Sequence, residues 1–173
     1  KISFIGGGNM AQALISGLVS CGVKPSLITV ADPSSEAREQ LAAKGLNTVD
    51  PTADAKAAVI GADIVVLAVK PQVMKAVVSG FADVLDTQLV ISVAAGLSTE
   101  LLSNMLGGYG NIVRAMPNTP AMIQMGATGL YGTDDISAEQ KQLATAVMEA
   151  SGLVMWVDNE EHMHAVTAVS GSA

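Results

Sequence analysis

The sequence contains little cysteine and little charge. Cys21 is the only cysteine among 173 residues, so no disulfide can form within the chain, and a cytoplasmic setting is expected. Charged residues make up only 14% of the chain, and its nine Lys and Arg residues are scattered rather than gathered in a basic stripe. Because the net charge is −7, the chain is not expected to bind nucleic acid. An anionic ligand would have to be held locally, by backbone amides and a few basic side chains.

Uninterrupted apolar runs long enough to cross a membrane are missing, and so are metal-ligand clusters. Residues 2–23 carry no charge, but three consecutive glycines and several polar residues interrupt them, and no basic segment precedes them. Neither a membrane span nor a signal peptide is therefore predicted. His162 and His164 are two residues apart and would point in different directions on a helix, so no metal site is expected.

The opening stretch KISFIGGGNMAQA combines a short apolar strand, a glycine turn and the start of a helix. Its Gly6-x-Gly8-x-x-Ala11 pattern fits the dinucleotide-binding fingerprint. Gly6 permits the turn, Gly8 has no side chain to hold a pyrophosphate away from the backbone, and Ala11 lets helix and strand pack closely. Free N–H groups at the helix start would face the anion. A purely structural glycine turn is the alternative.

The rest of the chain alternates apolar runs with helical patterns, and half of its residues are apolar. Residues 63–69, DIVVLAV, are apolar almost throughout, as expected of a strand buried on both faces. We therefore predict an α/β fold: a Rossmann-type doubly wound, mostly parallel sheet with helices on both faces. Helices are expected from Thr52 or Asp54 through Ile60, and from about Gln72 to Leu85.

The end of the second predicted strand, near residue 30, bears on the choice of cofactor. Asp32 stands where a carboxylate would bind the adenosine ribose hydroxyls of NAD. Ser34, Ser35 and Arg38 offer two hydroxyls and a guanidinium that could hold the 2′-phosphate of NADP. Ser34 or Ser35 could instead, or also, cap the following helix. These residues leave NADP and NAD both open.

Three later strand ends carry further candidates, because ligands of open α/β sheets bind outside the carboxyl ends of the strands. Small residues at the second of these ends would let a flat ring approach the backbone, and two prolines stiffen a polar loop at the third. The alternative interpretations are a solvated surface lysine at the first end, a simple glycine turn at the second and a mere connector at the third. The candidates at these ends are Lys70, Pro71, Ala94, Ala95, Gly96, Asn118 and Thr119.

The order of motifs resembles pyrroline-5-carboxylate reductase, the last enzyme of proline biosynthesis. The resemblance covers nearly the whole chain and rests on these segments: FIGGGNMAQA, LAVKPQ, VISVAAG, IVRAMPNTPAMI and AVTAVSGS. It implies NAD(P)H-dependent reduction of a cyclic imine carboxylate, with NADP the usual cofactor and NAD possible. Asp32 stands where many relatives have a neutral residue, and Ala55 where relatives often have an asparagine that touches the cofactor.

The resemblance also implies roles for particular residues. Glu160 falls near the substrate, as Asn118 and Thr119 are expected to do, and Ser34 lies at the adenosine end. The pyrophosphate would be held by Ile5, Gly6, Gly7, Gly8, Asn9 and Met10. The ribose and nicotinamide would be lined by Ala68, Val69, Lys70, Val93, Ala94 and Ala95.

The domain organisation follows from the same resemblance. Residues 1–158 would form the dinucleotide-binding domain, and residues 159–173 the start of a helix leading into a missing C-terminal helical domain. That domain would build a homodimer or higher homo-oligomer and complete the active site. No catalytic residue is assigned within the chain, which is expected to bind cofactor but turn over negligibly. Another Rossmann reductase, of the β-hydroxyacid dehydrogenase type, and a non-catalytic dinucleotide-binding module remain as alternatives.

Overall fold

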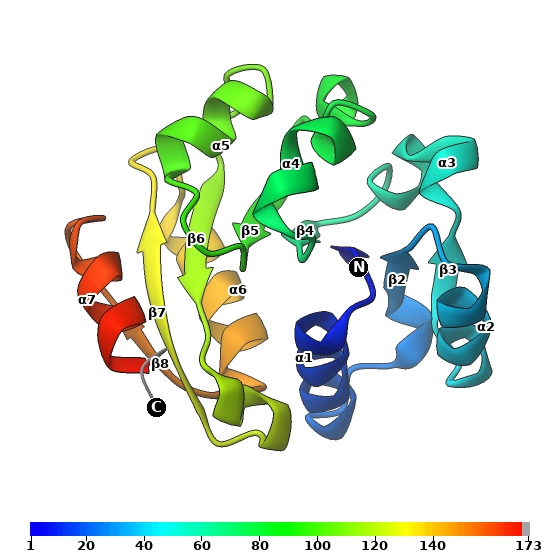
Figure 1. Ribbon diagram of the computed structural model, residues 1–173, viewed down its shortest axis with the longest axis horizontal. Coiled ribbons are helices and arrows are strands. Elements are labelled where there is room, and N and C mark those ends of the chain that lie inside the picture. The colour runs from blue at the N-terminus through cyan, green and yellow to red at the C-terminus, as the bar shows by residue number, and fades with distance from the viewer. Residues whose placement is uncertain (171–173) are drawn as a thin grey trace.

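The computed structural model describes residues 1–170, which form one eight-stranded sheet with helices on both faces (Figure 1). The strand order is β3-β2-β1-β4-β5-β6-β7-β8. The strands are β1 (Ile2–Ile5), β2 (Ile28–Ala31), β3 (Asn47–Val49), β4 (Ile64–Leu67), β5 (Leu89–Ser92), β6 (Ile112–Met116), β7 (Gly126–Gly132) and β8 (Gly152–Trp156). The first six run parallel, in the order that defines a doubly wound dinucleotide fold. The predicted fold class is confirmed.

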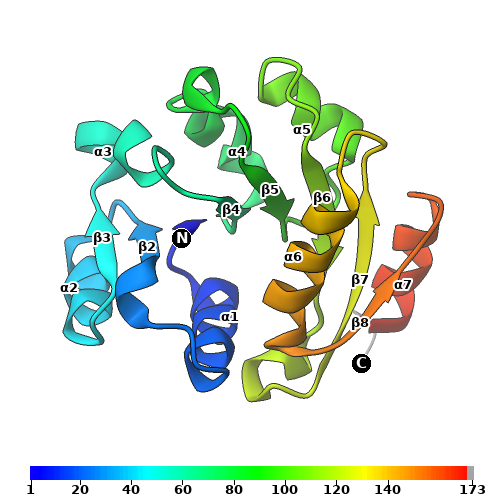
Figure 2. The ribbon, with the colours of Figure 1, turned by 180° about the vertical axis from the view of Figure 1, so that it is seen from behind.

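The helices divide into two layers, as the two opposite views show (Figures 1 and 2). The α-helices are α1 (Asn9–Ser20), α2 (Ser35–Ala43), α3 (Pro51–Asp54), α4 (Pro71–Val78), α5 (Thr99–Met105), α6 (Ala138–Glu149) and α7 (His162–Ser170). The 3-10 helices are η1 (Pro25–Leu27), η2 (Lys56–Ala58), η3 (Ala82–Val84) and η4 (Thr119–Ile123).

Each layer of helices has its own apolar core. Helices α1, α2 and α6 contribute Leu14, Leu41 and Val147 to one cluster, while α4 and α5 contribute Met74 and Leu102 to the other. The sheet separates the two clusters because alternate residues of each central strand point to opposite faces. The four residues of β4 are all buried, which explains why this strand appears in the sequence as an unbroken apolar run.

Two helices are shorter than the sequence pattern predicts. Helix α3 ends at Asp54 and gives way to η2, and α4 ends at Val78, before Ser79 and Gly80. The expected start of α3 at Thr52 or Asp54 is also wrong. The Asp50 side chain accepts from the amide of Thr52, so Asp50 caps the helix and Pro51 is its first residue.

The last two strands reverse direction relative to the rest of the sheet. β7 runs antiparallel to β6, with Arg114 opposite Tyr131, and β8 runs parallel to β7. Helix α6 covers one face of this edge, and α7 lies across the opposite face against β7 (Figures 1 and 2). The sequence pattern locates both strands but carries no information on their direction.

Helices α1 and α6 approach each other through a glycine. Gly17 is buried in α1, and a Cβ built on it would overlap the backbone carbonyl of Ala150, the residue that follows α6. The two helices therefore meet by backbone contact, which brings α1 close to the end of α6. Gly17 lies inside a stretch with a helical pattern and no turn-forming residue stands beside it. The sequence alone therefore does not reveal this contact.

Replacing Gly17 with alanine should destabilise the fold. The added methyl group has no space unless α1 and α6 move apart, so we expect the free energy of unfolding to fall by about 2–3 kcal/mol. Urea denaturation followed by circular dichroism measures the change. Ser16→Ala, on the exposed side of α1, is the matched control and should stay within about 0.5 kcal/mol of the wild type. Equal midpoints for the two variants would contradict the contact.

Candidate active site

The candidate site begins at Gly6, where the chain turns sharply after β1. Gly6 has a φ of +101°, and a Cβ on it would lie 2.7 Å from the carbonyl oxygen of Ala68, just after β4. Its amide donates to the carbonyl of Ala31 at 2.8 Å. The ends of β2, β1 and β4 are thereby joined around one backbone position that only glycine occupies without strain.

Gly7 connects this turn to the end of β2. Its amide donates to Oδ2 of Asp32 at 2.9 Å, and its carbonyl accepts from the Gln12 side chain, also at 2.9 Å. A Cβ on Gly7 would lie 3.1 Å from the Leu41 side chain and 3.2 Å from the Asp32 carboxylate. The glycine turn is therefore held from both sides, by Asp32 and by helix α1.

Gly8 differs from the other two glycines because the protein itself does not require it. Its φ is −72°, which any residue adopts, and a Cβ on it would meet nothing within 4 Å. It is the N-cap of α1, without a side-chain capping bond or an acidic residue in the first turn. The first hydrogen bond of the helix runs from Gln12 to Gly8, so the amides of residues 9–11 precede it. This open, positively polarised helix start suits a diphosphate.

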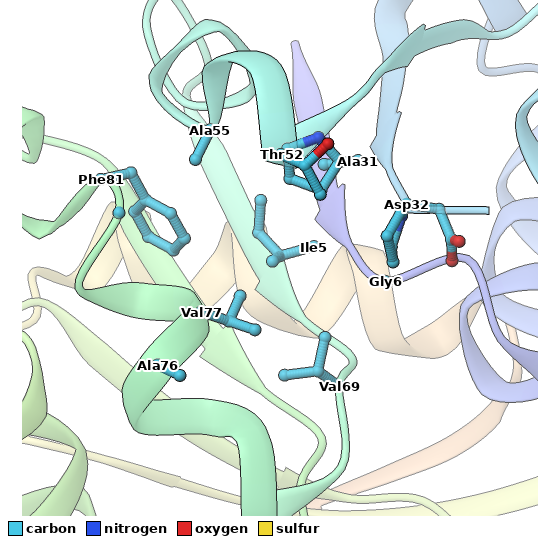
Figure 3. Close-up of a pocket in the computed structure, with 13 residues that line it drawn as sticks. Ile5, Gly6, Ala31, Asp32, Thr52, Ala55, Val69, Ala76, Val77 and Phe81 are labelled. Carbon is cyan, nitrogen blue, oxygen red and sulfur yellow. The ribbon is translucent and has the colours of Figure 1, made fainter. Parts of the chain in front are cut away.

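Beside the glycine turn lies a pocket of about 300 Å³ between the ends of β1, β2 and β4 and helix α4. Figure 3 shows Ile5, Val77 and Phe81 pointing into one space, with Gly6 and Asp32 at its side. The lining is apolar apart from Asp32 and Thr52, and its size suits a flat aromatic base. Its lining residues are Ile5, Gly6, Ala31, Asp32, Pro33, Pro51, Thr52, Ala55, Val69, Ala76, Val77, Gly80 and Phe81.

Five of the residues that line this pocket are named in the sequence-based predictions, and the other lining residues are not. Ile5, Gly6, Asp32 and Val69 were expected to contact cofactor, and Ala55 to have lost a contact. Val77 and Phe81 were not expected there. A signal was present: α4 carries apolar residues beyond those that face the core, so its apolar surface is wider than packing against the sheet requires.

Other predicted residues lie at the same edge but outside this pocket. Lys70 is exposed and precedes Pro71, the first residue of α4, as predicted. Ala68 and Val93 are half-buried and Ala94 is buried. Ala95 and Gly96 are exposed in the turn after β5, where Gly96 has a φ of +77°. Asp32 and Ser34 adjoin each other, because the Ser34 amide donates to Oδ1 of Asp32 at 2.8 Å.

Asn118, one of the two candidate substrate residues in the loop after β6, holds that loop in place. The Asn118 side chain accepts from the amide of Ala127 at 2.9 Å, which ties the loop to the start of β7. The loop continues into η4, which packs against α1. The side chain of Thr119 lies outside the described residues. This hydrogen bond gives Asn118 a structural role in addition to any contact with a ligand.

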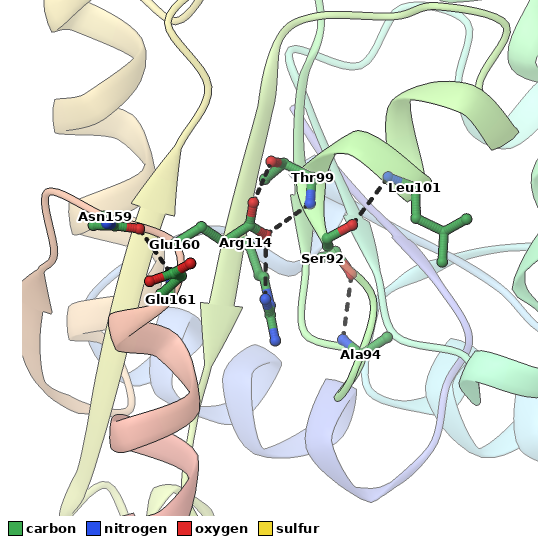
Figure 4. A network of polar contacts seen from close by, with 9 residues as sticks. Ser92, Ala94, Thr99, Leu101, Arg114, Asn159, Glu160 and Glu161 are labelled. Atoms are coloured by element: carbon green, nitrogen blue, oxygen red, sulfur yellow. Dashed lines mark hydrogen bonds and ion pairs between the residues drawn. The ribbon is translucent and has the colours of Figure 1, made fainter.

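Glu160 joins three elements in a polar network (Figure 4). Its carboxylate lies 3.2 Å from the Arg114 guanidinium of β6 and accepts from the amide and hydroxyl of Thr99 at 2.7 and 2.8 Å. The Arg114 side chain is 3% exposed and that of Glu160 22%. The segment before α7 is therefore held against β6 by a largely buried ion pair and against the start of α5 by two hydrogen bonds. The family resemblance implies a place near the substrate for Glu160, whereas its pairing with Arg114 is not evident from the sequence.

Neither a metal-binding cluster nor a membrane-spanning helix is found among the described residues. Within residues 1–170, no group of three or more His, Cys, Asp or Glu side chains could hold a metal ion. No helix in that range is long and apolar enough to span a bilayer. The open corner at Gly8, the free start of α1 and the apolar pocket together fit a dinucleotide.

These features define a dinucleotide-binding oxidoreductase domain, and comparison with known proteins agrees. Residues 1–96 match the family model described as NADP oxidoreductase, coenzyme F420-dependent, and the chain belongs to this family. Over its whole length it is similar to pyrroline-5-carboxylate reductases. The enzyme of that name from Pasteurella multocida is 45% identical over 175 aligned residues, which cover 100% of this chain and 64% of the relative.

Solved structures give the same result. The pyrroline-5-carboxylate reductase of Coxiella burnetii has a TM-score of 0.94 and 42% identity, covering 99% of this chain and 64% of that one. The pyrroline carboxylate reductase of Plasmodium falciparum, solved with NADP bound, has a TM-score of 0.85 and 26% identity over 99% of this chain and 62% of that one. The chain thus spans slightly under two thirds of these relatives.

Removing the Glu160 carboxylate should weaken the fold, because Arg114 would be left buried without its partner. We expect Glu160→Ala to lower the free energy of unfolding by about 2–3 kcal/mol, somewhat less than for a fully buried pair. Guanidinium denaturation measures the loss. Glu161→Ala removes an adjacent, exposed carboxylate and should change stability by at most about 0.5 kcal/mol. If the two variants were equally stable, the network would have no structural role.

Proposed function

We propose that the chain is the cofactor-binding part of an NAD(P)H-dependent reductase that converts 1-pyrroline-5-carboxylate to L-proline, the last step of proline biosynthesis. The observation that carries the proposal is the 45% identity with a pyrroline-5-carboxylate reductase across the whole chain. The open glycine corner supports it independently, since it suits the diphosphate of a nicotinamide dinucleotide.

In this proposal the chain binds and orients the cofactor at the carboxyl edge of its sheet. The backbone of residues 5–11 holds the diphosphate, Asp32, Ser34 and Ser35 face the adenosine ribose, and the apolar pocket takes the adenine. Residues 68–71 and 93–96 line the other ribose and the nicotinamide. The reduced nicotinamide supplies a hydride to the imine carbon, and a proton taken up at the imine nitrogen completes the secondary amine.

The substrate would lie beyond the nicotinamide, near Asn118, Thr119 and Glu160. Asn118 and Glu160 hold the local backbone through the bonds described above, so they would shape this region as much as touch the ligand. Proton delivery and recognition of the substrate carboxylate are assigned to a helical domain following residue 158. No residue of the chain itself is proposed as the proton donor.

We also propose a cytoplasmic homodimer or higher homo-oligomer. The single cysteine suits a reducing compartment. An apolar patch marks a surface for contact with further protein: Leu153 and Met155 on β8 are 79% and 63% exposed, beside α7. Apolar side chains grouped in this way are typical of surfaces that contact further protein. In the proposal this patch packs against the helical domain.

The proposed reaction is tested with the complete protein. A steady-state assay with pyrroline-5-carboxylate and each reduced cofactor should show oxidation of the cofactor matched by formation of proline. The 173-residue chain alone should bind the cofactor yet reduce the imine negligibly, because half a site cannot position the two reactants. Substantial turnover by the chain alone would contradict this division of labour. Binding without turnover by the complete protein would contradict the reaction.

Gly8→Val separates ligand binding from folding. The added side chain would project into open space in the free protein, so the melting temperature should fall by no more than a few degrees, the small loss expected because valine is a poorer N-cap than glycine. The same side chain would occupy the space proposed for the diphosphate, and affinity for NADPH and NADH should fall about 100-fold or more, equivalent to about 2.7 kcal/mol. Fluorescence titration measures the affinity. Ser20→Val, at the other end of α1, is the control and should bind normally.

A further inference from the structure

The turn of residues 93–98 joins β5 to α5 at the carboxyl edge of the sheet. Its first residue is fixed to the neighbouring strand, because the Val93 amide donates to the carbonyl of Leu67, the last residue of β4, at 3.1 Å. The Ala94 amide donates to the Ser92 hydroxyl at 3.3 Å. The first half of the turn is therefore attached to the two strands beside it, β4 and β5.

The far end of this turn is held by a side chain from a distant part of the sequence. Thr99, the first residue of α5, is 6% exposed, and both its amide and its hydroxyl donate to the Glu160 carboxylate (Figure 4). Between the two ends, Ala95 and Gly96 are exposed. Their backbone is therefore placed by the residues that flank them.

Arg114 determines where the Glu160 carboxylate lies. Its guanidinium, on β6, is 3.2 Å from Oε1 of Glu160, the same oxygen that accepts from the Thr99 amide. The Arg114 side chain is 3% exposed, and within residues 1–170 Glu160 is the acidic side chain that pairs with it. Separating a buried guanidinium from its partner is costly, so the carboxylate has one favoured position. A strand inside the sheet thus sets the start of α5 through one carboxylate.

The position of this turn matters for the proposed reaction. Residues 93–96 and 68–71 are proposed to line the nicotinamide and its ribose, and the bond from Val93 to Leu67 ties the first segment to the end of the strand before the second. A misplacement of about 1 Å at the reacting atoms can lower a rate about 100-fold. A displaced turn would therefore disturb the nicotinamide, whereas the glycine corner and the adenine pocket are built by other elements.

We infer that Arg114 and Thr99 are positioning residues for the nicotinamide. Acting through the Glu160 carboxylate, they fix the turn of residues 93–98 against which the ring lies. The inference rests on the proposed function, because it requires this turn to line the nicotinamide. It gives Glu160 a role in cofactor geometry that is separate from the substrate contact implied by the family resemblance. It also specifies which half of the cofactor depends on the network.

Comparing NADH with ADP-ribose, which lacks the nicotinamide, separates this role from a general effect on the fold. Calorimetry with the 173-residue chain gives the dissociation constants of both ligands. The wild type should bind NADH more tightly than ADP-ribose, and Arg114→Met should weaken NADH about tenfold while ADP-ribose stays within about twofold. Equal binding of the two ligands by the wild type, an equal loss for both in the variant, or no loss for either would overturn the inference. If the wild type bound neither ligand, the proposed cofactor site itself would fail.

Thr99 supplies variants that leave the buried ion pair intact. Thr99→Val removes the hydroxyl but keeps the shape of the side chain, so it should weaken NADH about fivefold and ADP-ribose by less than about twofold. Thr99→Ser keeps the hydroxyl and should bind both ligands as the wild type does. Glu161→Gln alters an exposed carboxylate beside the network and is the matched control.

The Thr99 variants are decisive when circular dichroism shows an intact fold. A ratio of the two dissociation constants that is unchanged in Thr99→Val would overturn the assignment. So would a Thr99→Ser chain that behaves like Thr99→Val, because the loss would then follow the missing packing and not the missing hydrogen bond.

Discussion

A contact between two backbones, that of Gly6 and that of Ala68, sets the geometry of the whole ligand edge. The space between them admits no side chain, and Gly6 turns there with a positive φ while bonding to Ala31 on the other side. Three neighbouring strands therefore end at one place. Because α1 starts three residues later, its unbonded amides are directed over this edge, beside the pocket that β1, β2 and α4 form.

Two carboxylates extend this arrangement in different ways. Asp32 fixes the glycine turn through Gly7 and also lines the pocket, so one side chain both holds the turn and borders the candidate site. Glu160 lies farther along the sheet, where it links Arg114 of β6 to the start of α5. In both cases the carboxylate accepts hydrogen bonds from backbone amides, and these bonds hold the adjoining loops in place.

The sequence predicts those features that depend on neighbouring residues. The strand predicted within residues 63–69 is found there as β4, and Ser34, one of the two predicted caps, caps α2. Features that depend on distant residues were missed: the Gly17 contact with Ala150, the Arg114–Glu160 pair and the reversed direction of β7. The pocket combines both kinds of feature. Its glycine corner is visible as a local sequence pattern, whereas Val77 and Phe81 reach the pocket only through tertiary packing.

The central claim is that the corner at residues 6–8 and the start of α1 receive a diphosphate. Titrating the isotopically labelled chain with NADH, and following its amide resonances by NMR, tests this most directly. We predict that the amides of Gly8, Asn9 and Met10 shift most and saturate together with those of residues 68–70. A saturable shift confined to another surface, with these amides unmoved, would contradict the account.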